Sequence, residues 1–258
     1  MKPQVECVCG WHPVEELLAA EPGRVRELWL LHEKKDPRVS QLVDKARALA
    51  LRIRWARRGE LDRLARGAAH QGVAALADAK RIYELKQWLD LHPAGKSAAV
   101  KMVLAAVDEI EDPQNLGAIA RSALCLGARA LLAPQRRQAP VTAAAVRASA
   151  GALEKMDVIS VGNLAQALRD LKSAGFWIYG ADRAGLNVKK VSFNFPLALV
   201  IGSEHKGLRP LVRSHCDEIV SVAQDSGGVE SLNAACAATV LLHEIYSQAS
   251  GASKKVVE

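Results

Sequence analysis

Short apolar runs alternate with amphipathic stretches through most of the chain. Runs rich in branched and aliphatic residues, such as Val100–Val107, Ala130–Ala133 and Leu197–Ile201, have the length and composition of buried strands. The stretches between them, among them 116–126 and 164–174, have helical spacing. Strands that alternate with helices in this way predict an α/β fold with a mostly parallel sheet, covered by helices on both faces.

The N-terminal part repeats this alternation on a smaller scale. Strand-like patterns at 5–8, 27–31, 51–55 and 72–76 are separated by helical segments. Residues 1–78 are therefore predicted to form a small α/β domain with a core of its own.

The two parts are predicted to be joined by a linker over residues 79–98. Lys80–Leu91 can form an amphipathic helix, and His92-Pro93-Ala94-Gly95-Lys96-Ser97 is typical of turns and linkers. A second, larger domain is expected over 99–248. Residues 249–258 are small, polar and charged, and we expect them to form a disordered tail.

Charge and apolar content favour a globular protein with a polyanionic partner over a membrane protein. Half of the 258 residues are apolar, which is enough for a sizeable core, and the net charge is +7. Excess positive charge favours a polyanionic partner such as RNA, although a generic basic protein has the same balance. No apolar run approaches the roughly 18–20 residues of a membrane span, and no signal peptide is evident, so we expect a cytoplasmic protein without membrane association.

The cysteines argue against a metal centre or a disulfide framework. No C-x-x-C pair occurs, and the number of cysteines, 5, is odd. Reduced thiols are the better interpretation, and no metal site is predicted. The five are Cys7, Cys9, Cys125, Cys216 and Cys236.

Basic residues gather in the first domain around a predicted strand. Arg52, Arg54, Arg57 and Arg58 lie close together in the sequence, and we expect them to contact RNA. A solvated charged face is the alternative interpretation, because charge runs often have no other role.

Polar residues in the second domain lie at strand and helix ends rather than in a known nucleotide-binding fingerprint. Neither G-x-G-x-x-G nor G-x-x-x-x-G-K-[ST] is present in the required context, and G-x-S-x-G is absent. Three sets remain: Asn115 with Arg121, Glu204 in a glycine-flanked loop, and Ser231 with Asn233. Each set alone could be a helix cap or a solvated loop. In an open α/β sheet, however, ligands bind at such strand ends.

The three sets belong to longer motifs that resemble those of a known family. The motifs are Asp112-Pro113-x-Asn115-Leu116-Gly117-Ala118-x-x-Arg121-Ser122-Ala123, Leu199-Val200-Ile201-Gly202-Ser203-Glu204-x-x-Gly207-Leu208 and Ser231-Leu232-Asn233. Together they resemble the SpoU (TrmH) family of RNA ribose methyltransferases in the SPOUT superfamily, over about residues 99–246. Gly10-x-His12-x-Val14-x-x-Leu17-Leu18 and His70-Gln71-Gly72 resemble the substrate-binding domain of members that methylate a guanosine in 23S rRNA.

The resemblance implies structural features that periodicity does not predict. The family's C-terminal domain threads its last segment through a loop to form a deep trefoil knot, which binds S-adenosylmethionine. Gly202, Val222 and Leu232 occupy the positions that hold the cofactor. Members act as homodimers in which each site is completed across the interface, so a homodimer is expected.

The resemblance also implies roles for the polar residues. Methyl transfer to a ribose requires that the 2′-hydroxyl be positioned and its proton managed. In the family, the residue at the position of Arg121 is proposed to help remove this proton. Because a guanidinium normally stays protonated, we favour a second role, in which Arg121 clamps the adjacent phosphate and stabilises the developing alkoxide. Asn115 and Asn233 can orient Arg121 or the ribose. Glu204 and Ser231 can hydrogen-bond the same region, which completes the set of five predicted catalytic residues.

One stretch departs from the family pattern. Where members have an Ile-Pro-like turn, the chain has Val222-Ala223-Gln224-Asp225-Ser226-Gly227-Gly228-Val229-Glu230, which lacks the proline and is slightly longer. The corresponding loop contacts the cofactor in the family, so this change in sequence can lower the affinity for the cofactor. Loss of a proline reduces rigidity but removes no reactive group.

The leading functional hypothesis is S-adenosylmethionine-dependent 2′-O-methylation of structured RNA, most specifically of a guanosine in 23S rRNA. A tRNA ribose methyltransferase is the alternative of the same class, against which the N-terminal domain argues. A catalytically silent RNA-binding protein on the same scaffold is an alternative of a different class, motivated by the altered 222–230 loop.

Overall fold

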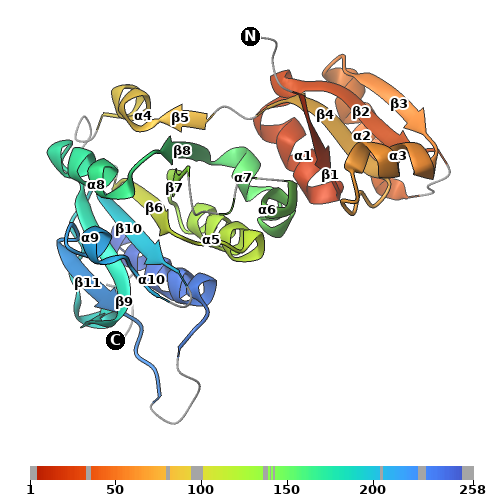
Figure 1. Ribbon diagram of the computed structural model, residues 1–258. Helices are drawn as coiled ribbons and strands as arrows, with labels where there is room; N and C mark the ends of the chain where they lie inside the picture. The colour runs from red at the N-terminus through yellow and green to blue at the C-terminus, as the bar shows by residue number, and fades with distance from the viewer. Residues whose placement is uncertain are drawn as a thin grey trace. The chain divides into compact units, whose positions relative to one another are not determined.

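The protein divides into two compact units (Figure 1). The computed structural model describes residues 5–32, 36–79, 82–93, 101–135, 139, 141, 143–203, 206–225 and 231–251. One unit comprises residues 1–81 together with 141–155, and the other comprises 82–140 together with 156–258.

The first unit is built on a four-stranded sheet of order β1-β4-β2-β3. Strand β4 is antiparallel to β1 and β2, whereas β2 and β3 are parallel. One face packs against α1 and α2, and the other packs against α3. The elements are β1 (Val5–Cys9), α1 (Trp11–Ala20), η1 (Pro22–Arg24), β2 (Val25–Leu31), α2 (Pro37–Ala48), β3 (Arg52–Ala56), α3 (Arg58–Ala65) and β4 (Val73–Asp78).

Two short helices from the second half of the sequence belong to this first unit. They are α6 (Ala143–Ala148) and α7 (Ala152–Lys155). Arg24 Nη1 lies 2.8 Å from a carboxylate oxygen of Glu21 and 2.8 Å from one of Glu154, whose side chain is almost fully buried. A buried carboxylate requires such a partner, so this ion pair helps to hold α7 in the first unit.

The second unit contains a seven-stranded sheet of order β11-β9-β10-β6-β7-β8-β5, whose strands pair in parallel. The predicted α/β fold with a mostly parallel sheet is thereby confirmed. The strands are β5 (Ile82–Glu84), β6 (Val103–Asp108), β7 (Ala130–Pro134), β8 (Asp157–Val161), β9 (Trp177–Asn187), β10 (Leu197–Gly202) and β11 (Glu218–Ser221).

Helices cover both faces of this sheet (Figure 1). Side chains of α4, α8 and α9, such as Trp88, Leu168 and Val212, form one buried cluster with alternate residues of the central strands. Helices α5 and α10 pack against each other and contact β6, β7 and β10 on the other face. The helices are α4 (Leu85–Leu91), α5 (Pro113–Cys125), α8 (Leu164–Ser173), η2 (Val188–Lys190), α9 (Pro210–Arg213) and α10 (Ala234–Ser250).

Two helical segments differ from the expectation. The helix expected at Lys80–Leu91 is present as the shorter α4, but the segment is not a free linker. Ile82–Glu84 forms β5 by pairing with β8, and Leu85 and Trp88 enter the core. The small-residue stretch expected as one helix is divided into α6 and α7. The chain leaves helical geometry at Ala150 and Gly151, whose φ values are 49° and 87°.

Two other expectations concern the C-terminal segment and the membrane. The trefoil knot stays a prediction, since residues 226–230, within the segment expected to thread, lie outside the described residues. The expected tail at 249–258 begins too early, because Ala249 and Ser250 belong to α10, and 252–258 lie outside the described residues. Within the described ranges, no helix has both the length and the apolar content needed to cross a bilayer.

Replacing Trp88 tests whether α4 is an integral part of the second unit. The Trp88 ring is fully buried, stacks on His92, and donates from Nε1 to Asp157 Oδ2 over 2.9 Å. We expect Trp88→Ala to lower the free energy of unfolding by about 3–5 kcal/mol in urea titrations. Leu91→Ala, at an exposed position of the same helix, is the matched control. Equal effects of the two substitutions would contradict this role for α4.

Candidate active site

A cavity of about 190 Å³ lies at the carboxyl ends of β9, β10 and β11. This is the edge of a parallel sheet at which ligands bind. All three predicted cofactor-binding residues, Gly202, Val222 and Leu232, line it, together with the predicted catalytic residue Ser231. Positions that lie far apart in the sequence are thus brought to one cavity.

The loop after β10 forms one wall of the cavity by turning back on itself. Ser203 and Gly207 exchange two backbone hydrogen bonds, of 3.2 and 2.9 Å. Gly207 has a φ of 64°, which favours glycine, and the backbone N–H of Lys206 donates to Ser203 Oγ. Glu204 and His205 lie outside the described residues, so the predicted role of Glu204 stays a prediction.

An ion pair anchors the far end of the same loop to the central strand β6. Asp108, the last residue of β6, is fully buried and receives hydrogen bonds from the Arg209 backbone N–H (2.9 Å) and Nε (2.7 Å). Arg209 Nη2 is 2.6 Å from the same carboxylate, and Nη1 is 3.5 Å from Glu109 Oε1. Such charge-assisted, multiply bonded contacts fix the loop against the sheet.

The first and third motifs are joined by an amide pair. Asn233 is the N-cap of α10, and its Oδ1 accepts from the Ala235 N–H over 2.8 Å. Its Nδ2 donates to Oδ1 of Asn115, in the first turn of α5, over 3.0 Å. The cap of α5 itself is Asp112, whose side chain accepts from Gln114 N–H. The amide of Asn115 is thereby placed beside the start of α10, where the third motif lies.

Arg121 lies on the exposed side of α5. It makes no hydrogen bond or ion pair within the described part of the chain. Its neighbour Ser122 hydrogen-bonds Thr239 of α10 over 2.7 Å, which fixes α5 and α10 against each other. The guanidinium is thus carried on a rigid helix but has no described protein partner, as expected of a group that binds substrate.

The predicted RNA-binding arginines belong to the first unit, and all four are exposed. Arg52 lies 3.1 Å and Arg54 3.7 Å from Glu27, and Arg54 also stacks over the ring of Trp29. Arg57 is the N-cap of α3 and Arg58 is its first residue.

Several lining residues were not predicted from the sequence. Asp182 and Arg183, in the outer half of β9, line the cavity, as do Ser203 and Ser221. Asp182 pairs with Arg213 over 2.6 Å. The rule that ligands bind at the carboxyl ends of strands would have identified Asp182 and Arg183, because they follow the apolar run Trp177–Tyr179.

The described part of the second unit includes Cys216 and side chains of the metal-ligating types. Cys216 lies against Gly180 in β9, and burial raises the pKa of its thiol to about 12, so it stays protonated at neutral pH. Among the described residues, no group of three or more His, Cys, Asp or Glu side chains is arranged to hold a metal ion.

Comparison with known protein families assigns each part of the chain. Residues 102–243 match the SpoU rRNA Methylase family, and residues 7–83 match the family described as RNA 2′-O ribose methyltransferase substrate binding. The first match spans more than half of the chain and contains all three motifs.

Full-length relatives are also similar. A protein of Bacillus subtilis, named a putative TrmH family tRNA/rRNA methyltransferase, is 35% identical over 95% of this chain and 97% of its own length. Proteins of Xanthomonas campestris (35% identical, over 98% of this chain and 100% of theirs) and Pseudomonas aeruginosa (36%, over 95% and 97%) are named 23S rRNA (guanosine-2′-O-)-methyltransferase.

Solved structures share the fold of the whole chain. The SpoU methyltransferase AviRb of Streptomyces viridochromogenes, in complex with its cofactor AdoMet, has a TM-score of 0.75 at 25% identity, over 96% of this chain and 91% of its own. An RNA 2′-O ribose methyltransferase at 22% identity also gives 0.75, over 95% and 89%. The family resemblance seen in the motifs is confirmed, and the chain belongs to the SpoU rRNA methylase family.

Proposed function

We propose that the protein transfers a methyl group from S-adenosylmethionine to the ribose 2′-hydroxyl of a guanosine in 23S rRNA. The observation that carries the proposal is that residues of all three motifs lie at one end of the parallel sheet. Asn115 bonds Asn233, while Gly202 and Ser231 line one cavity. The names of the Xanthomonas and Pseudomonas relatives, which match over nearly their whole length, support the same reaction here.

The cavity has the chemistry that the cofactor requires. Ile201, Val220 and Leu241 supply apolar walls for the adenine and the methionine chain, and Ser221 and Ser231 supply hydroxyl groups. A Cβ on Gly202 would lie 2.3 Å from the carbonyl carbon of Gly207, so main chain closes that wall. The sulfonium of S-adenosylmethionine supplies the methyl group and a neutral leaving group.

The residues of the chain then have to position the ribose and stabilise its charge. Arg121 can bind the phosphate next to the target and stabilise the alkoxide that develops as the hydroxyl proton passes to solvent water. The Asn115–Asn233 pair, held by the cap of α10, can orient that hydroxyl. Glu204 belongs to the same proposal through its place in the second motif.

The first domain is proposed to bring the RNA to this site. Residues 1–78 would bind substrate through Arg52, Arg54, Arg57 and Arg58, while 99–248 carry catalysis. The exposure of all four arginines supports this division. RNA modification of this kind is consistent with the cytoplasmic location that we infer.

Two alternatives to methylation of 23S rRNA each have one observation in their favour. The Bacillus relative is named for both tRNA and rRNA, so a tRNA ribose is the second candidate substrate. A silent RNA-binding protein is favoured only by the loop at 222–230. Val222 nevertheless lines the cavity despite the missing proline, and Ala223 and Gln224 are exposed.

We also propose that the protein acts as a homodimer through the α5–α10 face. Val240 and Tyr246 of α10 are large apolar side chains left exposed, as is Leu232 just before this helix. Val240 adjoins Thr239, which bonds Ser122 next to Arg121. A second copy covering this face would bury the apolar residues and complete the site around Arg121.

Mapping of ribose methylation tests the reaction and the role of Arg121 together. Incubated with S-adenosylmethionine and unmodified 23S rRNA, the protein is expected to methylate one guanosine, and tRNA is expected to stay unmodified. Arg121→Ala should slow transfer by about 10²–10³-fold while leaving S-adenosylhomocysteine binding intact, because Arg121 is proposed to contact the RNA phosphate and the developing alkoxide but not the cofactor. Arg121→Lys, which keeps the charge without the planar fork, should retain part of the rate.

Methylation of tRNA instead would replace the substrate and keep the chemistry. RNA binding without any transfer would favour the silent scaffold. Normal turnover by Arg121→Ala would remove the arginine from the mechanism.

The dimer is tested by sedimentation. Val240→Glu places a charge on the proposed apolar interface and should convert the protein to monomers with loss of methyl transfer. Leu91→Glu, an equal change at an exposed position of α4, should leave the dimer intact. A wild-type protein that sediments as a monomer at assay concentrations would contradict the proposal.

A further inference from the structure

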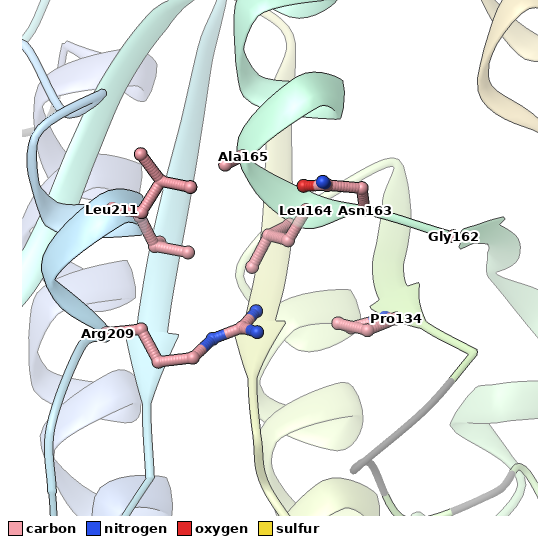
Figure 2. A pocket seen from close by; sticks show the side chains of 8 residues that line it. Pro134, Gly162, Asn163, Leu164, Ala165, Arg209 and Leu211 are labelled. Atoms are coloured by element: carbon pink, nitrogen blue, oxygen red, sulfur yellow. The ribbon is translucent and has the colours of Figure 1, made fainter.

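A second cavity, of about 320 Å³, lies at the carboxyl ends of β7 and β8 (Figure 2). It is formed by Pro134, by Gly162–Ala165 at the start of α8, and by Arg209, Leu211 and Val212 around α9. Its volume is in the range of ligand sites, and the motifs described above contribute none of its residues. It lies at the same edge of the sheet as the proposed active site, and one loop borders both.

The guanidinium of Arg209 presents a flat, fixed surface to this cavity. Figure 2 shows it extending between Leu211 and Pro134, with Leu164 close by. Its Nε and Nη2 are held by the buried carboxylate of Asp108, and Nη1 faces Glu109 over 3.5 Å. These contacts lie along the N–H edges of the guanidinium. The flat face of the guanidinium is therefore left for stacking.

The charges around Arg209 argue against an anionic ligand. Among the described residues that line the cavity, Arg209 alone is charged, and the carboxylates of Asp108 and Glu109 beside it offset that charge. A phosphate would therefore meet little excess positive charge from these residues. A neutral planar group suits the site better, since it can stack on the guanidinium and contact Pro134 and Leu211.

A single amide adds a directional contact. Asn163 caps α8 through Oδ1, which accepts from Gln166 N–H over 3.2 Å. Its Nδ2 has no partner within the described part of the chain, and the residue lines the cavity. The site therefore offers a hydrogen-bond donor, which matches a base edge that presents acceptors, as O6 and N7 of guanine do.

We propose that this cavity holds an unpaired base of the RNA substrate, stacked on Arg209 and hydrogen-bonded by Asn163. The inference rests on the proposed function and adds to it a place where the RNA sequence is read. Stacking of unpaired bases on arginine planes is a general mode of RNA recognition.

The test compares two asparagine caps that undergo the same change. Asn163→Asp keeps the capping oxygen but replaces the donor by an acceptor, whereas Asn187→Asp makes the same change at the cap of η2, outside the cavity. We expect Asn163→Asp to weaken binding of unmodified 23S rRNA by about tenfold, and Asn187→Asp to leave it unchanged. Neither change should alter S-adenosylhomocysteine affinity.

Crosslinking gives a readout that does not depend on turnover. Leu211 lines the cavity and is largely exposed, so a benzophenone amino acid can replace it with little effect on folding. Irradiation with 23S rRNA is expected to label one nucleotide near the methylated guanosine. If the two aspartate variants bind RNA equally well, or if labelling is scattered over many nucleotides, the base site is overturned. The proposed function survives either result as long as the wild-type protein transfers methyl groups to RNA. Failure of the wild type to methylate any RNA overturns both.

Discussion

The loop after β10 approaches its own strand so closely that only glycine fits at position 202. A Cβ there would lie 2.3 Å from the carbonyl carbon of Gly207 and 2.5 Å from the nitrogen of Leu208, far inside any observed contact. Both neighbours are main-chain atoms and cannot move as a side chain can. This close approach sets the shape of the proposed cofactor cavity, because Gly202, Ser203 and Gly207 all line it. The wall is therefore made by backbone, which suits a site that must hold a ligand in one conformation.

The buried carboxylate of Asp108 holds the other end of that loop. Asp108 pairs in register with Gly202 across β6 and β10, and it binds both the backbone and the guanidinium of Arg209. A carboxylate with no solvent exposure is stabilised only by such a full set of partners. The ion pair thereby connects two neighbouring strand ends and lies between the two cavities. The proposed cofactor site and the proposed base site therefore share one structural support.

Local patterns were sufficient for the central strands and for the polar motifs, because each rests on a short run of residues. Local patterns were insufficient where contacts with distant parts of the chain determine whether a segment forms a strand or which side chains pair. The outer half of β9 contains Asp182, Arg183 and Gly185 and has a loop-like composition. It continues the strand because Leu186 and Asn187 beyond it pair with β11, across a register shift that takes up the residues between. Strand β5 is too short to be recognised without its partner β8. The Asp108–Arg209 pair, separated by 101 positions, leaves no local signal.

If main chain around Gly202 shapes the proposed cofactor site, the protein binds S-adenosylhomocysteine in a way that depends on this glycine, which calorimetric titration measures. We expect the wild-type protein to bind, and Gly202→Ala to lose at least tenfold in affinity. Gly23→Ala, at a glycine with no atom near its missing Cβ, should bind as the wild type does. Ala237→Leu, which narrows the cavity from α10 without changing the backbone, should also weaken binding if Gly202→Ala is too unstable to measure. Undiminished affinity in Gly202→Ala and Ala237→Leu would contradict the claim.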